Sequence, residues 1–131
     1  MSTFRKNERL SSQKEITQLV KEGNTFLCYP LRVLWLVSHN ERNASFQIQA
    51  AFSVPKKKFK KAVDRNTLRR RLKEAFRHNK DAFKKEMKDY PYTVSLLIIF
   101  TPVNALNYEK IEAGIKKSFQ ILKKQIAEKT Q

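Results

Sequence analysis

Basic side chains are unusually dense in one short stretch of the chain. In AVDRNTLRRRLKEAFR (residues 62–77), six of the sixteen side chains are Arg or Lys and only two are acidic. An exposed helix usually mixes the two signs, because like charges four residues apart destabilise it. A guanidinium group can donate two parallel hydrogen bonds to the oxygens of one phosphate and can stack on a base, whereas an ammonium group acts as a point charge. The chemistry that this stretch indicates is therefore the binding of a polyanion.

The spacing of these residues predicts a ridge along a helix. Arg65, Arg69, Lys73 and Arg77 recur every four positions, with Arg70 beside them. They span about 18 Å of helix axis at 1.5 Å per residue, which matches several consecutive phosphates. The apolar residues fall on the neighbouring arc of the same helix: Leu68, Leu72, Ala75 and Phe76. Because that stripe carries the packing, we expect replacement of Arg65 and Arg69 by Ala to leave folding intact.

Phe59, Asn66 and the more distant Trp35 each allow two interpretations. The segment PKKKFKK at 55–61 places five lysines around Phe59, which either packs at a strand–helix corner or stacks on a base. Asn66 is a weak helix former, so it is either a local cap or a ligand contact. Trp35 lies in a predicted strand, where packing in the core is the commoner role. Core packing is the simpler interpretation for both aromatic residues.

The whole composition points to the same class of partner. The chain has 131 residues, 28 Lys and Arg against 12 Asp and Glu, a net charge of +16 and a sequence pI of about 10.2. Such a charge suits nucleic acid or an anionic membrane surface. No apolar run approaches the roughly 20 residues of a membrane span, and MSTFRKNERLSS lacks the apolar centre of a signal peptide. We therefore expect a cytoplasmic protein with no membrane partner.

Residues for catalysis or metal binding are sparse. Cys28 is the single cysteine, and His39 and His78 are far apart, so no zinc-binding spacing exists. The sequence also has no paired-carboxylate motif and no glycine-rich phosphate loop. We expect no catalytic residue and no metal site on this polypeptide.

The elements that would position the basic residues follow from periodicity. Helical spacing occurs in three segments: 12–22, Ala62 to about Phe83, and Tyr108 to Lys129. Apolar alternation or a continuous apolar run indicates a strand in three others: 26–38, 45–54 and 92–100. A further short strand at 54–58 is also compatible with the pattern. The order α-β-β-α-β-α predicts one α+β or α/β sandwich, a single domain over 1–131 with a basic tail at about 1–11.

The stretch FSVPKKKFKKAVDRNTLRRRLKEAFR (52–77) resembles the signature of the bacterial ribonuclease P protein subunit. That signature reads F-S-V-x-K-K, then A-V-x-R-N-x-x-K-R-x-x-R, with A-F shortly after. The matching residues here are Phe52-Ser53-Val54, Lys56-Lys57, Ala62-Val63, Arg65-Asn66, Arg69-Arg70, Lys73 and Ala75-Phe76. Arg69 stands where the family usually has Lys, and Lys73 where it usually has Arg. The segment 4–23 is also similar to the family's basic start and first helix.

The resemblance implies an α+β fold with a small mixed sheet and a left-handed β-α-β crossover, a fold shared with one domain of a ribosomal protein. It also implies a ribonucleoprotein enzyme that removes the 5′ leader from precursor tRNA. In that enzyme the large RNA subunit carries catalysis, and Mg²⁺ is bound by the RNA subunit and substrate. The protein binds this RNA and holds the leader in a cleft between the first helix and the sheet, with no protein partner required.

Residue by residue, the resemblance assigns two groups. The RNA subunit would be contacted by Arg65, Asn66, Arg69, Arg70, Lys73, Lys56 and Lys57. The leader cleft would be lined by Ile16, Val20 and Trp35, with Trp35 as the stacking surface.

Two other classes of function remain open at this point. One is a non-catalytic structural RNA-binding protein, such as a ribosomal protein or an RNA chaperone, which would use the same basic ridge. The other is a membrane-surface protein, which would need an exposed amphipathic helix with bulky apolar residues. The last helix has an apolar stripe, but a one-domain core needs that stripe.

Overall fold

The computed structural model of the chain describes residues 13–39 and 46–129. The elements follow in the order α1 (Gln13–Glu22), β1 (Asn24–Cys28), β2 (Leu31–His39), β3 (Gln47–Ser53), α2 (Ala62–Glu86), β4 (Tyr92–Phe100) and α3 (Tyr108–Lys129). The expected basic tail at about 1–11 lies outside the described residues. None of the described helices is long and apolar enough to cross a lipid bilayer.

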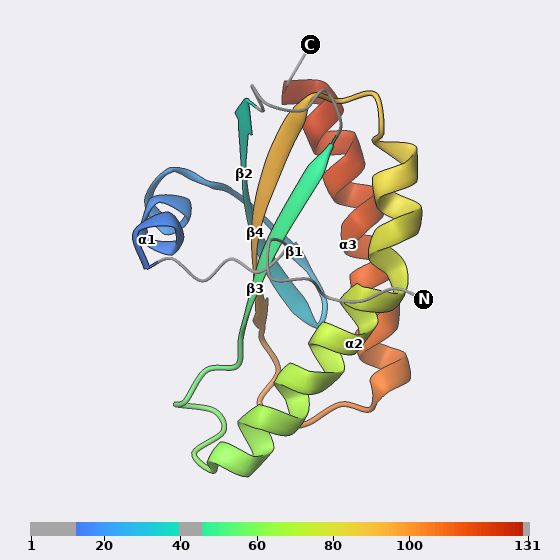
Figure 1. The fold of residues 1–131 in the computed structure, drawn as a ribbon. Coiled ribbons are helices and arrows are strands. Elements are labelled where there is room, and N and C mark those ends of the chain that lie inside the picture. The colour runs from blue at the N-terminus through green and yellow to red at the C-terminus, as the bar shows by residue number, and fades with distance from the viewer. Residues whose placement is uncertain (1–12, 40–45, 130–131) are drawn as a thin grey trace.

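Three layers make up the molecule (Figure 1). A four-stranded sheet in the order β1-β2-β4-β3 separates α1 on one face from α2 and α3 on the other. The pairs β1–β2 and β2–β4 are antiparallel and the pair β3–β4 is parallel, so the sheet is mixed. This is the α+β sandwich with a small mixed sheet that the sequence and the resemblance predict.

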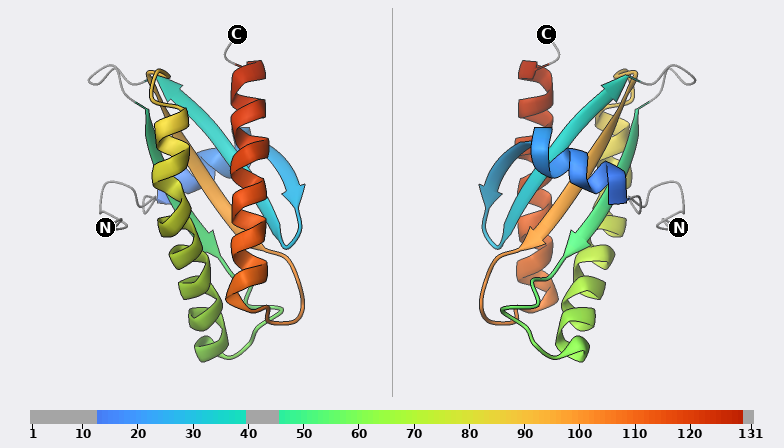
Figure 2. Two further views of the ribbon diagram at one scale, coloured as in Figure 1. Left: turned by 90° about the vertical axis from the view of Figure 1, so that its right-hand side faces the viewer. Right: turned by 90° about the vertical axis from the view of Figure 1, so that its left-hand side faces the viewer.

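The connection from β3 through α2 to β4 is left-handed. With α2 and α3 toward the viewer in the left view of Figure 2, β3 and β4 both run downward and β4 lies to the right of β3. A right-handed crossover in front of downward strands would step to the left instead. About 98% of such connections are right-handed. The resemblance, rather than the hydrophobic pattern, predicted this rare hand, and it is confirmed.

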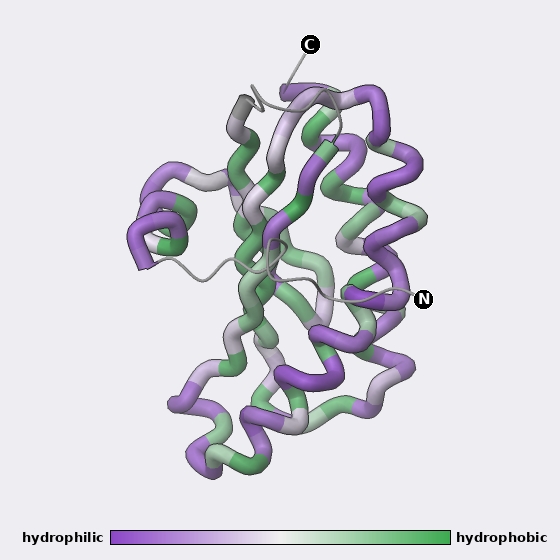
Figure 3. Tube along the Cα trace, in the orientation of Figure 1, coloured by the Kyte–Doolittle hydropathy of each residue, from purple (hydrophilic) through white to green (hydrophobic). Residues whose placement is uncertain are grey.

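The strands divide their side chains between the two helical layers by simple alternation. On β2, Leu31, Val33 and Trp35 face α2 and α3 in the main core, whereas Leu34 and Leu36 pack toward α1. Figure 3 shows the corresponding distribution, with apolar segments between the layers and hydrophilic ones on the outer turns of the helices. Residues that a ligand could reach on the sheet must therefore come from the α1 face.

The expected single strand over 26–38 is wrong. It is a β-hairpin whose strands β1 and β2 meet at a turn formed by Tyr29 and Pro30. Proline favours a turn because its ring fixes φ and it has no N–H to donate. The Pro30 carbonyl accepts hydrogen bonds from both the backbone N–H and the hydroxyl of Thr101, at 3.0 and 3.1 Å. The hairpin therefore adds a strand to the expected order and gives the sheet β1 as an edge.

Smaller differences concern the ends of elements. The segment 54–58 is a turn rather than an extra strand, since the N–H groups of Lys58 and Phe59 both donate to the carbonyl of Pro55. Helix α2 continues to Glu86, three residues beyond Phe83, where it was expected to end. Strand β4 and helix α3 have the predicted bounds.

Candidate nucleic-acid interface

Helix α2 presents its basic residues because its opposite side is fixed in the core. Leu68, Leu72, Ala75 and Phe76 are all buried, as the helical stripe predicted. The ring of Phe76 contacts Phe52 of β3 edge-on, with the ring centroids 5.6 Å apart. The stretch of α2 from Leu68 to Phe76 is thus a firm support, and its outer flank carries the cations.

Four of the predicted residues line one shallow hollow on that flank, with a volume of about 270 Å³. They are Asn66, Arg69, Arg70 and Lys73, and we call this set the basic hollow. The side-chain oxygen of Asn66 accepts a hydrogen bond from a guanidinium nitrogen of Arg69 at 3.2 Å. Asn66 is also four residues inside the helix, so it is not a cap. Its hydrogen bond instead orients Arg69 at the hollow.

Arg65 is placed differently from the other members of the predicted ridge. One guanidinium nitrogen donates to the carbonyl oxygens of Phe59 and Lys60, at 2.7 and 2.9 Å. The half-buried side chain therefore ties the segment before α2 to the first turn of the helix. The predicted contact of Arg65 with RNA remains a prediction, but its guanidinium already has two partners inside the protein.

Arg77, at the far end of the ridge, is also paired. Its guanidinium is hydrogen-bonded to the carboxylate of Glu74, which also lies 3.0 Å from a ring nitrogen of His78. The hydrogen bond from Arg77 is the main reason that the pKa of Glu74 is lowered, and the same bond raises the pKa of Arg77. Much of the Arg77 charge is thus balanced locally, so the ridge is effectively shorter than its spacing suggests.

The lysines of the segment 55–61 extend the cationic surface beside the first turn of α2. Lys56 and Lys57 are exposed in the turn after Pro55. Phe59 is only 8% exposed, and its ring lies 5.8 Å from that of Phe100. The core interpretation of Phe59 is therefore correct, and the buried ring anchors the turn that displays the two lysines.

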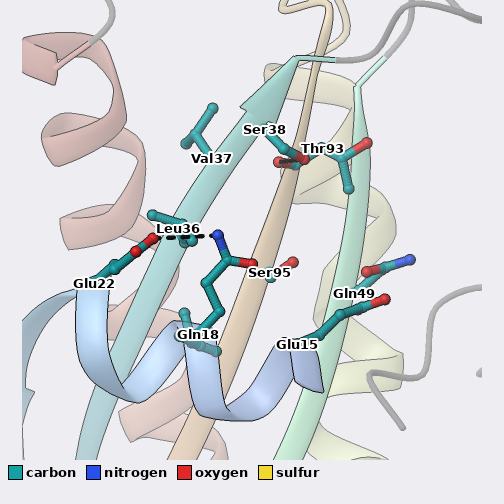
Figure 4. A pocket seen from close by; sticks show the side chains of 10 residues that line it. Glu15, Gln18, Glu22, Leu36, Val37, Ser38, Gln49, Thr93 and Ser95 are labelled. Carbon is teal, nitrogen blue, oxygen red and sulfur yellow. Dashed lines mark hydrogen bonds between the residues drawn. The ribbon is translucent and has the colours of Figure 1, made fainter. Parts of the chain in front are cut away.

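The other face of the sheet has a groove along one side of α1, with a volume of about 470 Å³ (Figure 4). We call it the α1 groove, and its lining residues are Glu15, Gln18, Leu19, Glu22, Leu36, Val37, Ser38, Gln49, Thr93 and Ser95. Two carboxylates, Glu15 and Glu22, project from the helix into its rim, and the Gln18 amide donates to Glu22 at 3.2 Å. This groove is polar and acidic, which disfavours a phosphate backbone.

A second groove lies on the same face at the opposite ends of β2 and β4, with a volume of about 490 Å³. We call it the hairpin groove, and its lining residues are Leu27, Arg32, Pro55, Lys58, Ile99, Phe100 and Thr101. Leu27, Arg32 and Ile99 are cross-strand neighbours on the α1 face. The Lys58 ammonium donates to the carbonyl of Thr101 at the same place. Two cations on apolar walls make this groove chemically opposite to the α1 groove.

Ile16 and Val20 belong to the edge of α1 that faces away from its acidic side. At 100° per residue, both lie on one side of the buried Leu19, and Glu15 and Glu22 lie on the other. Ile16 packs partly against the sheet, and Val20 is exposed. Because the α1 groove occupies the acidic side, these two residues border the half of the sheet that contains the hairpin groove.

The prediction that Trp35 lines the leader cleft is wrong. Trp35 is 1% exposed, and its indole N–H donates to the side-chain oxygen of Gln125 on α3 at 2.9 Å. It faces the helical layer opposite α1, and its neighbour Leu34 lies on the α1 face instead.

Sequence reasoning also missed Arg32 and Lys58 as candidate contacts in the hairpin groove. Strand alternation could have found Arg32, since it is two residues from Leu34 on the same face.

The chain is similar to known proteins of one family. The family model for ribonuclease P matches residues 4–123. A ribonuclease P protein component of Porphyromonas gingivalis is 30% identical over 113 residues, which cover 86% of this chain and 81% of that protein. One from Prochlorococcus marinus is 56% identical over 39 residues, 30% of each chain.

Solved structures support the fold. The ribonuclease P protein of Staphylococcus aureus superposes with a TM-score of 0.65 at 19% identity, over 90% of this chain and 97% of that one. The protein from Thermotoga maritima gives a TM-score of 0.64 at 20% identity, over 86% and 94% of the two chains.

Within the described residues, no group of three or more His, Cys, Asp or Glu side chains is arranged to hold a metal ion.

Proposed function

Since the chain belongs to the ribonuclease P protein family, we propose that it is the protein subunit that binds the catalytic RNA and the 5′ leader of precursor tRNA. In this proposal the ribonucleoprotein is an endoribonuclease that removes the leader in the cytoplasm. The RNA subunit carries out the cleavage, and the polypeptide contributes binding energy and position. No protein partner is required for the reaction.

The observation that carries the proposal is the basic hollow. Two guanidinium groups and one ammonium group surround a single concavity, and no carboxylate lines it. The hydrogen bond to Asn66 already restricts the Arg69 side chain, so Arg69 loses less conformational entropy when it binds a phosphate. A ridge that was merely solvated would not need one of its arginines to be oriented in this way. The helix would face the RNA subunit here, with Lys56 and Lys57 extending the contact.

The leader would follow the hairpin groove rather than the α1 groove. Single strands bind where a cationic path runs beside apolar surface, because phosphates need the charge and bases need a face to pack on. Arg32 and Lys58 supply the charge in the hairpin groove, and Leu27 and Ile99 supply the surface. The groove also adjoins the turn that carries Lys56 and Lys57. A strand could therefore pass from the RNA-subunit contact to the leader site over a continuous basic surface.

We propose that Mg²⁺ is held by RNA and not by this polypeptide. Mg²⁺ would be bound by the RNA subunit and the substrate, and it would supply the charge stabilisation that phosphodiester cleavage needs. The residues of the basic hollow would neutralise phosphates of the folded RNA, so that fewer free cations are needed for the same structure. The protein would thereby lower the Mg²⁺ concentration at which the enzyme works.

Salt dependence of binding to the RNA subunit tests the proposal. If about six to ten phosphates are engaged, a log–log plot of affinity against salt has a slope of about −4 to −8. The double variant Arg69→Gln, Arg70→Gln should reduce the magnitude of this slope by about 1.4 to 1.8. Lys85→Gln with Lys88→Gln removes the same charge from exposed sites near the other end of α2 and is the matched control. An RNA affinity that does not change with salt, or a salt slope that is reduced equally in both double variants, would exclude the hollow as the RNA contact.

A further inference from the structure

The turn of the β1–β2 hairpin is packed directly on α3. At Gly114 of α3, an added Cβ would lie 2.6 Å from Cδ of Pro30, so only glycine allows this approach. The thiol of Cys28, just before the turn, points to the carbonyl of the same glycine at 3.8 Å. The left view of Figure 2 shows the hairpin turn beside the first half of α3, on the side away from α2. This contact fixes the turn residue Tyr29, which is 73% exposed.

Three lysines form a stripe on the outer face of α3. Lys110, Lys117 and Lys124 recur every seven residues, about 10.5 Å apart along the axis, and all three are exposed. None of them has an ion pair within the part of the chain that the structure describes. The lysines on the flank nearer α2 differ, because Lys116 lies 3.9 Å from Glu112 and Lys123 lies 3.2 Å from Glu86. Among the described residues of α3, the three lysines of the outer face therefore have no ion pair of the kind that balances Lys116 and Lys123.

This stripe continues the surface of the hairpin groove. Leu27, which lines that groove and is 68% exposed, precedes Tyr29 by two residues. Pro30 rests on Gly114, which follows Lys110 by four residues and precedes Lys117 by three. The order in space is thus the hairpin groove, then an exposed aromatic ring, then the lysines of α3. A basic path with an aromatic platform rounds the β1 edge of the sheet.

We propose that Tyr29 and the lysines of α3 bind the upstream part of a long 5′ leader after it leaves the hairpin groove. Tyr29 stacks on a base and the lysines contact phosphates, which is how proteins hold single strands without reading their sequence. The protein thereby favours precursors with long leaders over those with short ones. This inference rests on the proposed function, since it extends the path of the same strand.

The chemistry of the surface favours RNA over a lipid surface. An amphipathic helix that binds membranes carries bulky apolar side chains beside its lysines. On α3 the exposed non-lysine positions between Lys110 and Lys124 hold Ala113 and Gln120, and the one bulky apolar side chain beside the stripe, Ile121, is half-buried. An exposed ring at the end of a cationic groove instead provides stacking and cation contacts together.

The test compares substrates that differ only in leader length. The stripe from Lys110 to Lys124 is about 21 Å long, which corresponds to about six stacked nucleotides at 3.4 Å each. The affinity of the reconstituted ribonucleoprotein is therefore measured for precursor tRNA with a short leader and with one longer by about six to ten nucleotides. The variants are Lys110→Gln with Lys117→Gln, Tyr29→Ala, and the control Lys85→Gln with Lys88→Gln.

We expect both test variants to lose affinity for the long leader only. The loss should be about fivefold for the lysine pair and at least about fivefold for Tyr29→Ala. The control pair should bind both leaders like the native protein. Equal losses for short and long leaders, no loss for either, or weaker binding of the RNA subunit alone would overturn the inference. Circular dichroism of each variant verifies that these exposed substitutions leave the fold intact.

This inference and the proposed function fail in different ways. If the proposed function is wrong, the Arg69→Gln, Arg70→Gln variant binds the RNA subunit as tightly as the control pair does. If only the leader extension is wrong, that variant still loses RNA affinity, and the lysines of α3 make no difference to long leaders.

Discussion

Replacing Arg65 with Ala should leave the chain folded, as the sequence predicts, but should lower its free energy of unfolding by about 1–3 kcal/mol because of contacts that helical spacing did not predict. The guanidinium donates hydrogen bonds of 2.7 and 2.9 Å to the carbonyl oxygens of Phe59 and Lys60. A hydrogen bond from a charged donor contributes about 1.5–3 kcal/mol when it is well shielded. Arg65 is half-buried and both carbonyls can rebind water, so the sum for the pair is discounted to the stated range. The turn that displays Lys56 and Lys57 should become more mobile at the same time.

Urea unfolding followed by circular dichroism measures this effect. Arg65→Lys retains the charge but not the planar group that reaches two carbonyls, so it should recover only part of the stability. Arg69→Ala is the matched control, because among the described residues its guanidinium bonds Asn66 alone, on the helix surface, and it should change stability by less than about 0.5 kcal/mol. In binding assays, Arg69→Ala should weaken the RNA-subunit complex without this loss of stability.

One result would refute the structural role of Arg65. It is an Arg65→Ala variant that unfolds at the same urea concentration as the native protein and loses as much RNA affinity as Arg69→Ala. The guanidinium would then serve the RNA, and the two carbonyl contacts would be dispensable.

Three further predictions follow from the packing and electrostatics. Trp35→Ala should destabilise the fold by about 3–5 kcal/mol, measured by urea unfolding, because the ring fills the main core; a folded variant with a selective leader defect would contradict this. Gly114→Ala should cost about 1–3 kcal/mol in the same assay, because its Cβ would strike Pro30, and an unchanged midpoint would refute the close contact. The pKa of Glu74 is lowered chiefly by the hydrogen bond from Arg77. The contribution of Glu74 to stability is therefore complete at pH values above the ordinary carboxyl pKa, and it is lost as pH falls through the lowered pKa. Glu74→Gln should therefore weaken the loss of stability on acidification, and identical pH profiles would disprove the pairing.

The parts of the structure that sequence predicted well are those governed by local spacing. Strand β4 and helix α3 have the expected bounds, because one has a continuous apolar run and the other a regular helical stripe. Spacing likewise predicted that Arg69, Arg70 and Lys73 lie together, although as part of a longer ridge, and the resemblance added Asn66 to them. Asn66, Arg69 and Lys73 lie three or four residues apart on one helix, and a helix brings such residues together whatever surrounds it.

The errors occurred where the answer depends on contacts between distant segments. Residues 26–38 are apolar on both strand faces, so the pattern could not show which of Leu34 and Trp35 faces α1. The same apolar run hid the two-residue turn at Tyr29 and Pro30. The engagement of Arg65 depends on how residues 59–60 fold back toward α2, which helical spacing does not specify.

The most direct test of the proposed function is cleavage of precursor tRNA by the host's large catalytic RNA at low Mg²⁺, with and without this protein. The proposed function predicts that release of the 5′ leader under these conditions needs both components. It also predicts that the Arg69→Gln, Arg70→Gln variant fails to restore cleavage at protein concentrations where the Lys85→Gln, Lys88→Gln variant succeeds. Tight binding of the RNA without any stimulation of cleavage would contradict the proposal and would favour a structural RNA-binding protein.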